Sequence, residues 1–84
     1  MSWTYVLATP AQRDMRRLEQ ALRQRILRAI RRYTNEGLGD VVKLMGRQEE
    51  WRLRVGEYRV RFRRDTANQT IVVLRVQPRR EAYR

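Results

Sequence analysis

Hydrophobic residues recur along the chain with two different periods, and the change of period separates a helical part from a part made of strands. Residues 3 to 8, WTYVLA, alternate as the residues of a strand do. Thr9 suits a helix N-cap, Pro10 suits the first helical position, and Gln12 completes a Thr-x-x-Gln capping box. The pattern therefore predicts a strand that is followed at once by a helix.

The predicted helix carries one apolar stripe, at spacings of mostly three and four residues, formed by Met15, Leu18, Leu22, Ile26, Ala29, Ile30 and Tyr33. Gly37 follows the stripe at the place where glycine commonly ends a helix. A break near Leu18 and Glu19 would turn one long helix into a helical hairpin, and the periodicity permits both arrangements. In either case the stripe is expected to face a core.

Residues 37 to 50, GLGDVVKLMGRQEE, contain three of the four glycines and predict the one long connection of the chain. We expect Val41, Val42 and Leu44 to pack part of this connection onto the core. After it, the hydrophobic period changes from that of a helix to that of a strand.

The segment WRLRVGEYRVRFRRD, residues 51 to 65, predicts a β-hairpin. Gly56 and Glu57 fit a two-residue type II′ turn, with glycine at the first central position. That turn sets the cross-strand pairs as Val55 with Tyr58, Arg54 with Arg59, Leu53 with Val60, Arg52 with Arg61, and Trp51 with Phe62. The apolar side chains then share one face of the hairpin, which supports this register.

Residues 70 to 77, TIVVLRVQ, predict a further strand that is apolar on both faces, with Val72, Leu74 and Val76 on one and Ile71, Val73 and Arg75 on the other. A run of this kind is typical of a strand inside a sheet. We therefore expect an α+β fold: an N-terminal strand, a helical hairpin or long helix, and a three-stranded antiparallel meander. The helices are expected to cover one face of the sheet.

Composition adds a strong positive charge to this picture. The 84 residues indicate a single domain, residues 1 to 84, with 20 Lys+Arg against 9 Asp+Glu and a formal net charge of +11. Such a field attracts polyanions or an acidic protein. Lys43 is the only lysine. The preference for arginine fits phosphate recognition through the planar guanidinium, and it fits a GC-rich genome equally well.

The residues that are missing exclude several kinds of chemistry. The chain has no cysteine and no histidine, which excludes disulfides, thiolate chemistry, the usual zinc sites and imidazole catalysis. We expect no metal and no cofactor. The apolar runs reach only about four residues, against roughly 18 for a membrane span, and MSWTYVLATP lacks the features of a signal peptide. We therefore expect a cytoplasmic protein without a membrane partner.

The predicted hairpin places arginines opposite one another on the face away from the core. Arg52, Arg54, Arg59 and Arg61 share this face, and like charges in cross-strand pairs cost about 0.2 to 1 kcal/mol each. No acidic residue is interleaved on either strand, so the face reads as a phosphate-binding surface. The alternative is an ordinary solvated face rich in arginine.

The C-terminal residues extend this surface. The tail PRREAYR is expected to bring Arg79, Arg80, Tyr83 and Arg84 to a rim of the same sheet. Guanidinium groups bind phosphates, and a tyrosine ring can stack on a base of a single strand. A structural alternative for Tyr83 is an edge aromatic that closes the core.

The segments KLMG, WRLRVGEYRVRFRRD, TIVVLRV and RREAYR, in this order, resemble the RelE/ParE superfamily of toxins from type II toxin-antitoxin modules. TPAQRDMRRL is similar to the start of the first helix of those toxins, so the resemblance covers nearly the whole chain. It implies a RelE-like fold, with a helical hairpin against a four-stranded sheet. One departure is Pro78, where many relatives have His or Lys before the arginine pair of the tail.

The resemblance also implies a set of functional residues. Arg52, Arg54 and Arg59, with either Arg79 or Arg80 and with Tyr83, correspond to the catalytic residues of RelE-like members. We expect supporting contacts to RNA from Lys43, Arg61, Arg63, Arg75 and Arg84. With no histidine present, the general base is left to Tyr83, Glu81, Glu57 or a group outside the protein.

The function implied is that of an endoribonuclease that cuts messenger RNA in the ribosomal A site, without a metal, and so inhibits translation. The implied partner is a cognate antitoxin with an acidic or amphipathic helical segment, bound in a hetero-oligomer. One alternative is a ParE-like toxin that inhibits DNA gyrase without cutting nucleic acid. Another, from a different class, is a basic RNA- or ribosome-binding module that is not toxic.

Overall fold

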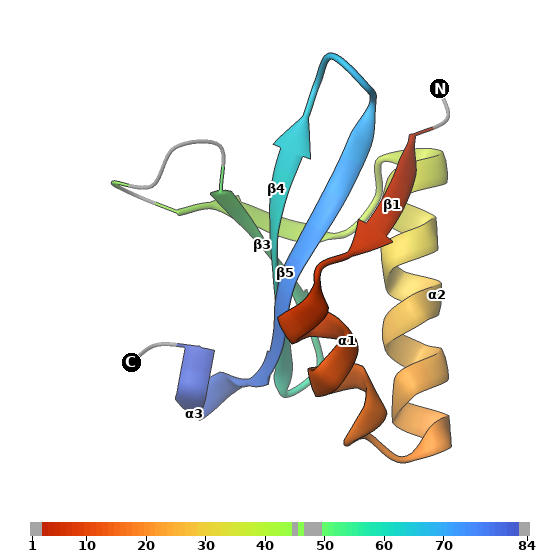
Figure 1. Cartoon of the computed structure of the whole chain (residues 1–84), viewed down its shortest axis with the longest axis vertical. Helices are drawn as coiled ribbons and strands as arrows, with labels where there is room; N and C mark the ends of the chain where they lie inside the picture. The colour runs from red at the N-terminus through yellow and green to blue at the C-terminus, as the bar shows by residue number, and fades with distance from the viewer. Residues whose placement is uncertain (1–2, 45, 47–49, 83–84) are drawn as a thin grey trace.

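The computed structural model describes residues 3 to 44, 46 and 50 to 82 as a mixed sheet with helices on both of its sides (Figure 1). The elements in chain order are β1 (Thr4–Leu7), α1 (Thr9–Arg16), α2 (Gln20–Glu36), β2 (Asp40–Lys43), β3 (Glu50–Val55), β4 (Tyr58–Asp65), β5 (Thr70–Pro78) and α3 (Arg79–Ala82). The strand order is β1-β5-β4-β3-β2, with β1 parallel to β5 and the other pairs antiparallel. None of the described helices is long and apolar enough to cross a membrane.

The α+β prediction is confirmed, and the helical part is a hairpin instead of one long helix. Arg17 and Leu18 end α1 with backbone bonds to residues three positions earlier, and α2 begins at Gln20 after the extended Glu19. Arg23 of α2 stabilises this break, because its guanidinium donates to the carbonyl oxygens of Met15 (3.1 Å) and Leu18 (2.6 Å) at the end of α1.

The predicted capping box at the start of the first helix is wrong. The N-cap residue is Ala8, and Thr9 is already the first residue of the helix. The backbone N–H of Ala8 donates to the carbonyl oxygen of Val73 in β5. Gln12 instead donates from its side-chain amide to the carbonyl oxygen of Leu7 (2.9 Å). The helix therefore begins one residue earlier than predicted, because β1 ends directly at the sheet edge.

The predicted long connection contains an additional strand, so the described sheet has five strands instead of the expected four. β2 pairs with β3 at the outer edge of the sheet, with Val41 opposite Leu53. Val41 packs against the core as expected, and Leu44 is half-buried, but Val42 is 48% exposed. The sequence gives no clear alternation here, because two successive valines occupy opposite faces of the strand and only Val41 packs against the core.

The predicted hairpin is confirmed in every pair of its register, from Val55 opposite Tyr58 to Trp51 opposite Phe62. Gly56 has φ 58°, whereas Glu57 has a negative φ, as a type II′ turn requires. Gly37 likewise ends α2 in the left-handed conformation, with φ 71°. Both predicted glycine positions are therefore correct.

The predicted faces of the last strand are only partly correct, because β5 contains an irregularity. Arg61 of β4 lies opposite Arg75 and Phe62 lies opposite Val73, so Leu74 is an extra residue in β5. The extra residue changes the alternation, and Ile71, Val73 and Val76 are all buried in the core.

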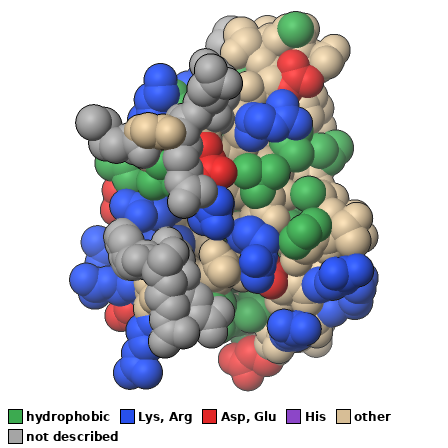
Figure 2. Space-filling view, turned by 60° about the vertical axis from the view of Figure 1, so that its left-hand side comes forward, with side chains coloured by type: hydrophobic (Ala, Val, Ile, Leu, Met, Phe, Trp, Pro, Cys, Tyr) green, Lys and Arg blue, Asp and Glu red, His purple; other side chains and the backbone are tan. Residues whose placement is uncertain are grey.

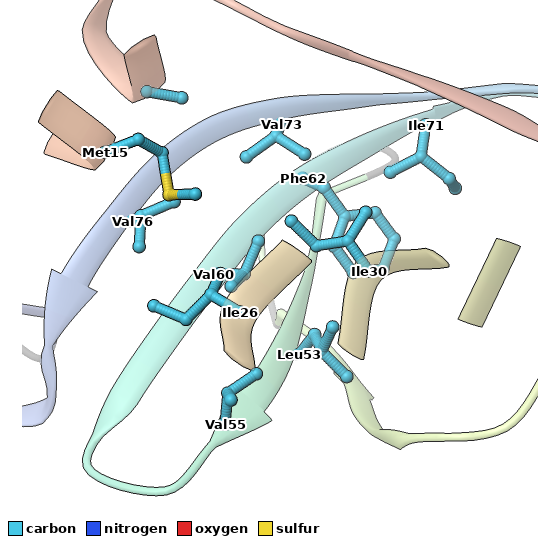
Figure 3. Close-up of a cluster of buried hydrophobic side chains, with 11 residues drawn as sticks. Met15, Ile26, Ile30, Leu53, Val55, Val60, Phe62, Ile71, Val73 and Val76 are labelled. Atoms are coloured by element: carbon cyan, nitrogen blue, oxygen red, sulfur yellow. The ribbon is translucent and has the colours of Figure 1, made fainter. Parts of the chain in front are cut away.

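The core lies between the helical hairpin and one face of the sheet (Figure 3). Its largest fully buried side chains are Phe62, Ile26, Ile30, Val60 and Val73, which come from α2, β4 and β5. The rings of Phe62 and Tyr33 lie 5.4 Å apart between centroids at 51°, a tilted aromatic pair. The helical stripe predicted from the sequence therefore supplies one half of this core.

Asp14 connects α1 to an uncovered edge of the interior strand β5. β1 ends at Leu7, so β5 continues beyond it with an edge that no strand covers. The Asp14 carboxylate accepts from the Val76 N–H (2.8 Å) and from the guanidinium of Arg75 (2.9 and 3.2 Å). The side chain of Asp14 thus replaces a strand partner at this edge.

We predict that Asp14→Ala lowers the free energy of unfolding by about 2 to 3 kcal/mol, because a buried N–H and a guanidinium both lose a charged acceptor. Urea denaturation measures this change. Glu19→Ala is the control, since Glu19 is exposed and its side chain makes no capping bond. An equal loss in both variants would contradict this assignment for Asp14.

Candidate nucleic-acid interface

The sheet face opposite α1 and α2 carries the arginines of the hairpin. We call this surface the arginine face and define it by Arg52, Arg54, Arg59, Arg61 and Arg63. Arg54 pairs with Arg59 and Arg52 pairs with Arg61 across β3 and β4, as predicted. Figure 2, which brings this side of the molecule forward, shows Lys and Arg side chains gathered over much of its left-hand half.

The five arginines differ in how far they reach solvent. Arg54 and Arg63 are exposed, Arg52 and Arg61 are half-buried, and Arg59 is only 3% exposed. Arg63 lies opposite Glu50, four residues from Arg54 along β3, so the backbone positions of the two exposed arginines are about 13 Å apart along the strands. Such spacing suits an extended polyanion.

Arg59 is bound to the turn of its own hairpin. Its Nη1 donates to the carbonyl oxygens of Gly56 (3.0 Å) and Tyr58 (2.9 Å). The catalytic role that the family resemblance implies for Arg59 stays a prediction. In the structure, the hydrogen bonds of Arg59 hold the carbonyl groups of the turn.

An acidic residue does accompany the arginines, which the sequence analysis missed. Glu50 is the first residue of β3, and both of its carboxylate oxygens lie 3.2 Å from Nη2 of Arg61. Glu50 stands just before the segment that was read as the hairpin. The ion pair reduces the repulsion between Arg52 and Arg61, so the arginine face is partly neutralised from within.

Two of the expected supporting residues point elsewhere. Lys43 lies opposite Trp51, with its Nζ 5.7 Å from the Trp51 ring, and directly paired residues share a face of the sheet. Lys43 therefore lies on the Trp51 side and not on the arginine face. Arg75 lies opposite Arg61, but its guanidinium binds Asp14 of α1.

The C-terminal arginines lie at the turn end of the arginine face. The Arg79 N–H donates to the carbonyl oxygen of Glu57 (2.7 Å), which fixes the start of α3 against the hairpin turn. Arg79 and Arg80 are exposed, and with Glu57 and Pro78 they line an open hollow of about 510 Å³. Tyr83 and Arg84 lie outside the described residues. Pro78 ends β5 opposite Tyr58.

The chemistry available at this surface is mainly electrostatic. Guanidinium groups donate hydrogen bonds to phosphate oxygens, but they stay protonated and do not accept protons. Within the described ranges, no three or more His, Cys, Asp or Glu side chains are grouped so that they could hold a metal ion. Glu57 is an exposed carboxylate at the hollow beside Arg79 and Arg80.

Solved structures with the same architecture place the domain in the RelE-like class of folds. The RelBE2 toxin-antitoxin complex from Mycobacterium tuberculosis matches with a TM-score of 0.80 and 28% identity, covering 94% of this chain and 100% of that one. The RelE-RelB complex from Pyrococcus horikoshii OT3 matches with a TM-score of 0.77 and 25% identity, covering 94% and 97%. Isolated E. coli RelE, at 14% identity and a TM-score of 0.73 over 92% and 84%, shares the fold.

The family model described as the ParE toxin of the type II toxin-antitoxin system parDE matches residues 5 to 83, so the chain belongs to this family of toxins. No curated protein sequence matches the chain significantly. The predicted membership of the RelE/ParE superfamily is thereby confirmed, and the chain is the toxin of a type II toxin-antitoxin system.

We predict that the affinity of the toxin for single-stranded RNA falls steeply with salt. If about five phosphates are engaged, log affinity against log salt has a slope of about −3.5. Arg54→Gln is expected to reduce this slope by about 0.7, because one phosphate contact is lost. Arg28→Gln, at an exposed position of α2, is the charge-matched control in a fluorescence anisotropy titration.

A flat salt dependence, or an equal change of slope in the Arg54 and Arg28 variants, would show that the arginine face is ordinary solvated surface. That result would support the alternative reading of the sequence.

A separate prediction concerns Arg59. We expect Arg59→Ala to lower the free energy of unfolding by about 1 to 3 kcal/mol, because the carbonyls of the turn lose a charged donor. Arg54→Ala, at the paired and exposed position, is expected to change it by less than about 0.5 kcal/mol. Thermal or urea unfolding of both variants compares the two directly, and equal stabilities would contradict a structural role for Arg59.

Proposed function

We propose that this toxin is an endoribonuclease that cuts messenger RNA in the ribosomal A site and so inhibits translation in the cytoplasm. The observation that carries this proposal is the juxtaposition of exposed arginines from two parts of the chain. Arg54 of β3 lies next to the hairpin turn, and α3 is bonded to that turn through Arg79. Arg79 and Arg80 line a hollow together with Glu57 of the turn, so the tail arginines lie at the same end of the sheet as Arg54.

The reaction we propose is attack by the 2′-hydroxyl oxygen of the RNA on the adjacent phosphorus. The new P–O2′ bond forms as the P–O5′ bond breaks, which leaves a 2′,3′-cyclic phosphate and a 5′-hydroxyl. Arg52 and Arg54 bind the phosphate oxygens, whose charge increases in the transition state. Donors that are already aimed at this charge lower the barrier without a metal.

Two proton transfers complete the step. A base takes the 2′-hydroxyl proton, and the departing 5′-oxygen receives a proton. Arginine does not act as the base, because its pKa exceeds about 12. Glu57 is a carboxylate that lines the same hollow as Arg79 and Arg80, while Tyr83 and Glu81 stay candidates from the tail. Arg79 or Arg80 stabilises the leaving oxygen.

A toxin built in this way depends on the ribosome for much of its rate. With only electrostatic groups and one exposed carboxylate at hand, orientation of the RNA must supply a large part of the acceleration. The messenger held in the A site provides that orientation. Free RNA does not, so it is expected to be a poor substrate.

The cognate antitoxin is the second partner. The solved relatives include RelB-RelE antitoxin-toxin complexes from three organisms. The net charge of +11 favours an antitoxin with an acidic or amphipathic helical segment, which forms a hetero-oligomer with the toxin.

A second candidate function is inhibition of DNA gyrase without cleavage of nucleic acid. The match of the ParE toxin family model to residues 5 to 83 favours this candidate. The burial of Arg59 also favours this candidate, because this arginine donates its hydrogen bonds to carbonyl oxygens of the hairpin turn. The arginine face would then grip DNA or an acidic protein surface.

Mapping the 3′ ends of messengers after induction of the toxin tests the proposal. We expect cuts at fixed positions relative to the ribosomal A site, and a loss of at least tenfold in cutting for Arg54→Ala, because a phosphate contact is removed. Arg28→Ala is the matched control on the outer face of α2. Intact messengers together with inhibited supercoiling by purified gyrase would instead establish the gyrase function.

A further inference from the structure

A second arginine site lies on the opposite side of the sheet, at the open end of the core. Arg64 of β4 lies opposite Ile71, whose side chain is buried in the core, so Arg64 points to the helix side and away from the arginine face. Its guanidinium carbon is 5.2 Å from the centroid of the Trp3 ring and 5.0 Å from that of Trp51. Two indole faces therefore hold one guanidinium in a fixed position.

This guanidinium has no acidic partner among the described residues. Nε of Arg64 is buried without a hydrogen-bond acceptor, and Nε1 of Trp51 is buried in the same condition. Buried donors are normally satisfied, and leaving one without an acceptor costs about 1 to 3 kcal/mol. The guanidinium of Arg64 donates and does not accept, so a group that satisfies it must be an acceptor, and a negative charge suits it best.

A pocket opens beside Arg64. It encloses about 280 Å³ and is lined by Trp3, Tyr33, Thr34, Glu36, Gly37, Arg64 and Ile71. A water molecule takes about 30 Å³ in the liquid, so this volume admits a whole side chain with its neighbouring atoms. Trp3, Tyr33 and Ile71 form the apolar part of the wall, and Arg64 is the only cation among the described lining residues.

We propose that this pocket binds an acidic side chain of the cognate antitoxin, with the carboxylate on Arg64 and an adjoining apolar residue against the aromatic wall. The net charge of +11 draws an acidic protein to this toxin, and the wall of Trp3 and Tyr33 supplies apolar area for an anchor residue. Leu38, directly after the pocket residue Gly37, is 48% exposed and extends the apolar surface.

A nucleic acid fits the same pocket less well. Glu36 lines it, and a fixed carboxylate repels a chain of phosphates more strongly than it repels one carboxylate. The exposed arginines of the arginine face, Arg54 and Arg63, lie on the other side of the sheet. In this proposal, each site binds a different partner: the arginine face binds nucleic acid, and the Arg64 pocket binds the antitoxin.

This inference rests on membership of the toxin family and does not require the proposed cleavage of messenger RNA. A toxin that inhibits gyrase would need neutralisation by its antitoxin in the same way. The experiment therefore reads antitoxin binding and toxicity separately.

The test uses the full-length toxin and the antitoxin encoded beside its gene. We expect Arg64→Gln to weaken toxin-antitoxin binding at least tenfold in biolayer interferometry, because the carboxylate loses its cation. Arg28→Gln removes the same charge from the exposed face of α2 and is expected to change the affinity less than threefold. Equal losses in the two variants would overturn the proposal, because they would indicate attraction by net charge alone.

Glu36→Gln provides a prediction of opposite sign. Removing the carboxylate from the wall is expected to strengthen antitoxin binding, while Glu19→Gln, an exposed residue before α2, leaves it unchanged. Unchanged binding by Glu36→Gln would contradict a carboxylate in this pocket. Circular dichroism checks folding, and Arg64→Lys, which retains the charge but not the planar fork, serves if Arg64→Gln does not fold.

Toxicity gives the second reading. Arg64→Gln expressed alone is expected to arrest growth as the original chain does, yet to resist neutralisation by the antitoxin. One Asp→Asn or Glu→Gln substitution in the antitoxin is expected to reproduce the loss of affinity without adding to that of Arg64→Gln. A loss of RNA binding by Arg64→Gln, with antitoxin affinity unchanged, would assign the pocket to nucleic acid and overturn the proposal.

Discussion

The contact of Asp14 with the edge of β5 is the interaction on which the remaining arrangement depends. β5 is an interior strand of the sheet, and its neighbour β1 ends before it does, so an unpaired stretch of backbone faces α1. Asp14 accepts from the Val76 N–H and pairs with Arg75 at that place. These interactions satisfy the exposed edge of β5 and hold α1 on the sheet. They also hold the guanidinium of Arg75 at Asp14 and away from the arginine face.

The arginines that face one another across the hairpin repel less than the sequence implies, because they have different partners in the structure. Arg59 is buried and holds carbonyl oxygens of the turn, and Arg61 is neutralised by Glu50. Arg54 and Arg63 are left exposed. Repulsion therefore acts over fewer pairs than the alternation implies, and the cations that reach solvent are those best able to contact phosphate.

The two faces of one sheet present arginine in different settings. On the outer face, solvated guanidinium groups stand beside the tail arginines, an arrangement suited to a flexible polyanion. On the helix side, Arg64 is held between Trp3 and Trp51, which fixes its direction and favours one well-placed acceptor. A toxin that must both act on a target and be silenced by a protein can use these settings independently.

Local patterns in the sequence were sufficient for the hairpin register, the type II′ turn at Gly56, the end of α2 at Gly37 and the interior position of β5, because each leaves a signal in consecutive residues. The break after α1 stayed open, since Arg23 supplies its capping bonds from the next helix. β2 and the extra residue at Leu74 were missed, because edge pairing and strand phase depend on partners far along the chain.

For the site, the sequence by itself determined which arginines share a face, because alternation and a two-residue turn leave only one register. Only the tertiary structure decided which of them are available. Burial of Arg59, the Glu50 partner of Arg61 and the Asp14 partner of Arg75 all arise from contacts that periodicity does not contain. Charge is a property of the residue, whereas its exposure and its partners belong to the packed fold.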